Sequence, residues 1–84
     1  MSKNSNIKLV KVITDLAIFL EFTSEDLLNP DSAIEVMEQI AAELQLLNDD
    51  EKQEVVRIFH DLSENYTGDT YEYVKGLPES LGLI

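Results

Sequence analysis

The sequence predicts an all-α protein, a compact four-helix bundle of three long helices and one short helix with a docked apolar C-terminal segment. Apolar residues recur at every third and fourth position, which is the helical period. The breaks between these runs begin with residues that cap helices, and no repeat, low-complexity tract or linker divides the chain. With 84 residues, 44% of them hydrophobic, residues 1–84 form one domain with one modest core.

The first helix is expected over residues 6–22, with Asn4 or Ser5 as its cap. Its β-branched start could also alternate as a strand, but the run is too long for one ordinary strand and contains no turn signal. Apolar residues lie on a wide face that includes Ile18, Phe19 and Phe22. This width predicts a central helix that is buried on more than one side.

The second helix is expected over residues 30–47, after a break at residues 23–28 that has room for one helical turn. Asn29 is a favoured cap, and Pro30 is suited to the first helical position. A single apolar stripe supports this helix. It consists of Ala33, Met37, Ile40, Ala41, Leu44 and Leu47.

The third and fourth helices are expected over residues 49–65 and 70–76. Asn48 and Glu51 have the spacing of a capping box, and the short connection predicts an antiparallel or steeply angled hairpin with the second helix. The fourth helix is expected to end at Gly76 and Pro78. The chain finishes with Leu81, Gly82, Leu83 and Ile84, and so apolar an end should pack back on the bundle.

The charge is strongly negative, with 17 acidic and six basic residues and a net charge of −11. Residues 15–84 contain all 17 acids and three of the bases, a net charge of −14, whereas residues 1–14 contain three lysines and no acid. This balance argues against binding nucleic acids or anionic membranes. Because no signal peptide or transmembrane run is evident and cysteine is absent, we expect a cytoplasmic protein without disulfides.

The sequence offers little for catalysis. His60 is the only histidine, and no cysteine pair, calcium loop, phosphate loop or dinucleotide fingerprint accompanies it. A nucleophilic triad needs a rigid site that excludes water, and the pattern contains no sign of one. We therefore expect no enzyme, no metal site and no cofactor.

One motif points to a different role. The string Asp31-Ser32-Ala33 resembles the Asp-Ser-Leu motif of acyl carrier proteins, which are short, acidic and helical. The resemblance implies that Ser32 would carry a phosphopantetheine arm. Pro30, Ala33 and the long third helix depart from that family, and the alternative is a plain polar residue in the first turn of a helix.

The segment from Glu64 to Tyr73 holds all three tyrosines, placed among acids around a turn. Tyrosine is enriched at binding hot spots, and neighbouring acids steer a basic partner. The expected partner-binding residues are Glu64, Tyr66, Asp69, Tyr71, Glu72 and Tyr73, with Glu35, Glu38, Asp49, Asp50 and Glu51 as an acidic flank. If Tyr71 and Val74 face inward, Tyr73 should lie outside, since it is about 200° from Tyr71 around the helix.

A small helical body with these features is similar in general character to the helical immunity proteins that neutralise bacterial nuclease toxins. The resemblance implies a cytoplasmic inhibitor that binds a basic protein and carries out no catalysis. The open alternatives are an acyl-carrier-like protein modified on Ser32 and a small helical bacterial domain with a structural or adaptor role. A homodimer is also left open, because Phe19, Phe22, Leu83 and Ile84 could leave apolar surface uncovered.

Overall fold

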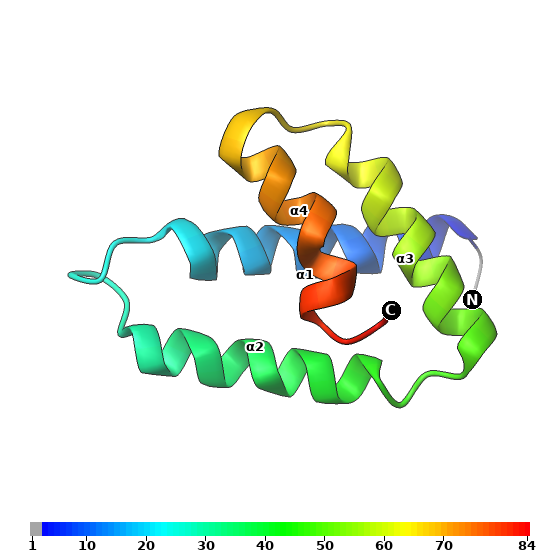
Figure 1. Cartoon of the computed structure of the whole chain (residues 1–84), viewed down its shortest axis with the longest axis horizontal. Coiled ribbons are helices and arrows are strands. Elements are labelled where there is room, and N and C mark those ends of the chain that lie inside the picture. Colours follow the sequence, from blue (N-terminus) through cyan, green and yellow to red (C-terminus); the bar gives the residue numbers. More distant parts are fainter. Residues whose placement is uncertain (1–2) are drawn as a thin grey trace.

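The structure is a computed structural model that describes residues 3–84, and it confirms the all-α class (Figure 1). The described residues form four helices and no strand. The helices are α1 (Lys3–Phe22), α2 (Pro30–Leu44), α3 (Asp49–Ser63) and α4 (Gly68–Ser80).

The helices are arranged around α1. Helices α3 and α4 form a roughly antiparallel hairpin that crosses α1, while α2 runs beside α1 in the opposite direction (Figure 1). The chain turns steeply from α2 into α3, as the short connection predicts. The elongated form, with extents of 39 × 27 × 21 Å, reflects the length of α1 and α2.

The core lies where the hairpin meets α1. Phe59 of α3 and Val74 and Leu77 of α4 are fully buried, and Val10 and Ala17 of α1 pack against them. Full burial of a valine, leucine or phenylalanine side chain contributes about 1.5–3 kcal/mol. Helix α2 adds one buried residue, Ala33, and otherwise contributes partly buried side chains to this core. They are Met37, Ile40, Ala41 and Leu44.

The two predicted asparagine caps are confirmed. The Asn29 Oδ1 atom accepts hydrogen bonds from the backbone N–H groups of Asp31 at 2.8 Å and Ser32 at 3.3 Å. Asn48 and Glu51 exchange two bonds of 2.9 Å in a complete capping box. Each cap satisfies N–H groups that a helix start leaves without partners, which contributes about 1 kcal/mol.

Several helix ends differ from the sequence prediction. Helix α1 begins at Lys3, so Asn4 and Ser5 lie inside it and do not cap it. Helix α2 ends at Leu44, and Gln45 begins a tighter turn toward α3. Helix α3 ends at Ser63, two residues earlier than predicted.

Helix α4 is longer than predicted because it continues through Gly76 and Pro78 to Ser80. A proline inside a helix removes one backbone hydrogen bond. Here Leu77 and Pro78 are fully buried, so packing against the core holds these residues in helical form. Tertiary contacts therefore override the local signal to stop.

The C-terminal segment docks on the bundle, as predicted, through a Schellman motif. The Leu83 N–H donates to the Pro78 carbonyl at 2.9 Å and the Gly82 N–H donates to the Glu79 carbonyl at 3.0 Å, with Gly82 at a φ of 75°. This turn places Leu83 in the core with 7% of its surface exposed, whereas Ile84 is 74% exposed. The Gln45 Nε2 atom donates to the Leu81 carbonyl at 2.9 Å and connects α2 to the same turn.

The expectation that α1 is a central helix agrees with its contacts to α2, α3 and α4, but the helix is not buried all round. Val10, Thr14 and Ala17 face the core, but the opposite side of the helix is open to solvent. Exposed apolar side chains on α1 include Leu9, Val12, Leu16, Phe19 and Phe22. In this fold no described segment covers that side.

Candidate functional site

The structure does not gather the three tyrosines at the α3–α4 junction into one exposed patch. Tyr66 packs against the core and lies near Lys11 of α1. Tyr71 is half-buried beneath the ammonium of Lys75, which lies 5.6 Å from the ring centroid. The predicted acids of this segment, Glu64, Asp69 and Glu72, are all exposed.

The expectation that Tyr73 lies outside is wrong. Its hydroxyl donates to the Ala17 carbonyl at 3.2 Å, and its ring meets that of Phe22 edge to face at 5.6 Å. Burial, together with the nearby charge of Glu21, raises the pKa of Tyr73 to about 12. The inward face of α4 runs through Tyr73, Val74 and Leu77, so it is rotated from the orientation that the sequence argument assumed.

The predicted acidic flank is exposed but divided. Glu35 and Glu38 lie on α2, whereas Asp49, Asp50 and Glu51 form the first turn of α3, beyond the far end of α2. Glu51 has a structural role as well, because its carboxylate accepts the Asn48 N–H. Of this set, Glu38 lines the same hollow as a predicted tyrosine, Tyr73.

Glu38 and Tyr73 both line a groove between α1, α2 and α4, which we call the α1–α2 groove. Its main hollow has a volume of about 280 Å³. The lining residues are Leu20, Glu21, Ala33, Ile34, Met37, Glu38, Tyr73, Ser80 and Leu81. A second hollow of about 200 Å³ shares Leu20, Glu21, Ala33 and Ile34 with the first and extends toward Glu25.

The groove combines an apolar floor with a negative rim. Leu20, Ile34 and Met37 supply apolar surface, and the carboxylates of Glu21, Glu25 and Glu38 lie along it. Neither hollow has a lysine or arginine among its lining residues. Such a surface suits an amphipathic segment that carries apolar and basic side chains.

The sequence pointed to two members of this groove, Glu38 and Tyr73, and missed the rest. Leu20 and Glu21 belong to the first predicted helix. That helix has many apolar and several charged residues, and nothing in the sequence distinguishes these two from the others. Ile34 gives the clearest missed signal, because it lies off the α2 stripe and is 57% exposed. An apolar residue off the core stripe of an amphipathic helix marks surface that is free for another contact.

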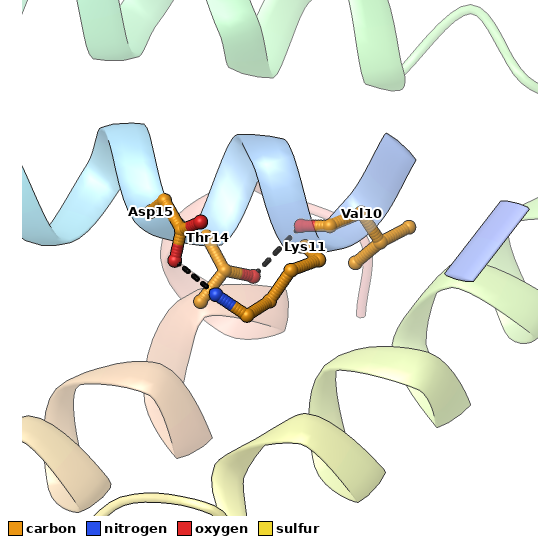
Figure 2. A network of polar contacts seen from close by, with 4 residues as sticks. All are labelled: Val10, Lys11, Thr14 and Asp15. Atoms are coloured by element: carbon orange, nitrogen blue, oxygen red, sulfur yellow. Dashed lines mark hydrogen bonds and ion pairs between the residues drawn. The ribbon is translucent and has the colours of Figure 1, made fainter. Parts of the chain in front are cut away.

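Two cations outside the groove, Lys11 and Arg57, form ion pairs within the chain. Lys11 pairs with Asp15 one turn along α1, beside the buried Thr14 hydroxyl, which donates to the Val10 carbonyl at 2.8 Å (Figure 2). The hydrogen bond to Asp15 raises the pKa of Lys11, and Tyr66 adds to this effect. Arg57 pairs with Glu54 on α3. Among residues 4–84 these are the two ion pairs, so the carboxylates of the groove keep their charge available.

At the other residues that the sequence analysis considered, Ser32 and His60, the structure shows no organised binding or catalytic site. Ser32 is exposed in the first turn of α2, where an attached group would be accessible, and its role as a carrier site stays a prediction. His60 is exposed near the end of α3. Within the described residues no cluster of three or more histidine, cysteine or acidic side chains is arranged to hold a metal ion. None of the described helices is both long and apolar enough to cross a membrane.

Comparison of the chain with models of protein families, with curated proteins and with solved structures finds no match.

Proposed function

We propose that this protein is a non-catalytic binding module that holds a basic, amphipathic segment of another protein in the α1–α2 groove. The observation that carries the proposal is the groove itself, in which an apolar floor is bordered by Glu21, Glu25 and Glu38 without a basic residue in its lining. Apolar side chains of the partner would cover Leu20, Ile34 and Met37, and its lysines or arginines would face the carboxylates.

The most concrete form of this function is an acidic immunity or inhibitor protein that neutralises a basic toxin. The net charge of −11 supports this form, because it accelerates encounter with a basic protein and repels nucleic acid. The partner to test first is a basic protein encoded beside this one. We expect binding that weakens as salt is added, because the attraction between exposed charges is screened.

The groove can be tested with charge-neutralising variants on one helix. Glu38→Gln removes a carboxylate from the groove, whereas Glu35→Gln makes the same change nearly one turn away on α2, outside the lining. Both substitutions change the net charge equally. Calorimetric titration with the basic partner should show affinity reduced about twofold to fivefold for Glu38→Gln and less for Glu35→Gln.

The α3–α4 junction, which the sequence analysis predicted as the partner-binding surface, is the alternative to the groove. A variant with Glu64→Gln, Asp69→Asn and Glu72→Gln neutralises three exposed carboxylates there and leaves the groove intact. If this variant loses the partner while Glu38→Gln binds normally, the groove assignment is wrong and the junction is the binding surface. Tyr73→Ala does not distinguish the two, since Tyr73 also packs in the core.

A mass measurement distinguishes the binding module from a different class of function, the acyl carrier. Ser32 is exposed, so a phosphopantetheinyl transferase would have access to it. We expect no gain in mass after incubation with that enzyme and coenzyme A. Addition of the arm at Ser32, absent in Ser32→Ala, would replace the binding-module proposal with the carrier function.

A further inference from the structure

The main hollow of the α1–α2 groove brings together carboxylates from two helices. Glu21 on α1 and Glu38 on α2 both line it, and neither carboxylate has an ion-pair partner among the described residues. No lysine or arginine belongs to the lining. Two like charges beside one hollow repel each other, and a cation bound between them offsets that repulsion. The hollow therefore favours a positively charged occupant.

The end of α4 adds to the negative potential of this hollow. Ser80 and Leu81, the last residue of α4 and its C-cap, lie in the same lining. The C-terminal end of a helix carries a partial negative charge on its carbonyl groups. Tyr73 also lines the hollow, close enough to Glu21 that the charge of this carboxylate contributes to the raised pKa of the Tyr73 hydroxyl. Three helices thus supply negative or aromatic groups to one hollow.

The size and the floor of the hollow restrict what this cation can be. The volume of about 280 Å³ lies below the roughly 300–1,000 Å³ of sites for small-molecule ligands, so a single side chain suits it better than a free metabolite. A divalent metal ion takes about six oxygen ligands, whereas Leu20, Ile34 and Met37 make much of this lining apolar. The occupant therefore combines a cationic head with an apolar stem, as the side chains of lysine and arginine do.

The aromatic ring and the paired carboxylates distinguish arginine from lysine. A guanidinium is planar, bonds to two carboxylates through separate N–H groups and stacks on aromatic rings. It is also more weakly hydrated than the ammonium of lysine, which loses more on entering a largely apolar hollow. Tyr73 supplies the ring, and its hydroxyl donates to the Ala17 carbonyl at 3.2 Å, which holds the ring in position before a partner arrives.

We propose that the main hollow is an arginine site, in which a guanidinium of the partner binds Glu21 and Glu38 beside the Tyr73 ring. This inference rests on the proposed function and deepens it, because it names the side chain that anchors the partner. The stem of the arginine lies over Ile34 and Met37.

Titration of the full chain with short peptides, followed by NMR, tests this site. The probes are acetyl-Leu-Arg-Leu-amide and the same peptide with lysine or citrulline at the centre, since citrulline keeps the shape of arginine without its charge. Methyl signals of Ile34 and Met37 report on the hollow, and those of Leu46, 81% exposed in the turn after α2, serve as the reference. We expect the arginine peptide to shift the signals of the hollow and to bind about twofold to fivefold more tightly than the lysine peptide. The citrulline peptide should bind at least about fivefold more weakly than the arginine peptide. Equal affinities, or no shift at Ile34 and Met37 up to about 10 mM peptide, would overturn the proposal.

A double-mutant cycle tests whether the guanidinium meets Glu38. Glu38→Gln should weaken the arginine peptide about twofold to fivefold and leave the citrulline peptide unchanged. Glu35→Gln, the matched control outside the lining, should keep the wild-type difference between the two peptides. The same difference in Glu38→Gln would refute the arginine site.

The peptide result and the proposed function can fail separately. If the peptides do not bind in the hollow while a basic protein still requires Glu38, the groove holds its partner without an arginine anchor and the inference is wrong. If the arginine peptide binds as expected but no basic protein depends on Glu38, the arginine site stands and the proposed function is wrong.

Discussion

The C-terminal turn provides the sharpest test of how this bundle is held together. Gly82 has a φ of 75°, and an added Cβ would lie 2.5 Å from the Gln45 Nε2 atom, which donates to the Leu81 carbonyl. The left-handed conformation costs an L residue about 1–2 kcal/mol, and displacing Gln45 from its acceptor costs about 0.5–1.5 kcal/mol more. Gly82→Ala should therefore lower the free energy of unfolding by about 1.5–3.5 kcal/mol. This is a large fraction of the roughly 4–13 kcal/mol expected for a domain of 84 residues.

Substitutions at the other two glycines distinguish the backbone cost from the loss of the Gln45 hydrogen bond. Gly68 also has a positive φ, of 60°, but an added Cβ meets nothing within 4 Å, so Gly68→Ala should cost only the backbone contribution of about 1–2 kcal/mol. Gly76 lies inside α4, also with open space around it, and Gly76→Ala should stabilise the protein by about 0.5–1 kcal/mol. Urea unfolding followed by circular dichroism measures all three. Equal losses for Gly82→Ala and Gly68→Ala would refute the role of Gln45, and a loss for Gly76→Ala would refute the continuous α4 helix.

Two further predictions concern the buried Tyr73 hydroxyl and the docked C-terminal residues. Because the folded-state pKa of Tyr73 is about 12, above its ordinary value of 10.0, the folded state holds this proton more tightly, and the free energy of unfolding should fall as pH rises from about 10 to 12. Tyr73→Phe should remove that part of the fall in urea titrations at about pH 9 and pH 11, and an unchanged pH dependence would place the hydroxyl in solvent. Leu83→Ala should cost about 2 kcal/mol, whereas Ile84→Ala should change stability by less than about 0.5 kcal/mol, because only Leu83 is buried. Similar values for the two would contradict the docked end.

The features that the sequence predicted correctly are those set by local chemistry. Asn29 and Asn48 cap helices through atoms only two or three residues away, so their role is readable without the fold. The fourth helix shows the opposite case. Gly76 and Pro78 are local signals to stop, but the burial of Leu77 and Leu81 keeps the chain helical through them. That burial depends on α1 and α3, which the local sequence does not contain.

The candidate site depended on knowing which faces meet. Helical spacing gave the angle between Tyr71 and Tyr73 but not the rotation of α4 against α1, and Tyr73 bonds to Ala17 because of that rotation. Apolar residues on both sides of α1 likewise predicted a wide buried surface. The chain covers only part of that surface: α3 and α4 pack on the face of Val10 and Ala17 and α2 contacts the helix beside it, which leaves Leu9, Val12 and Leu16 exposed.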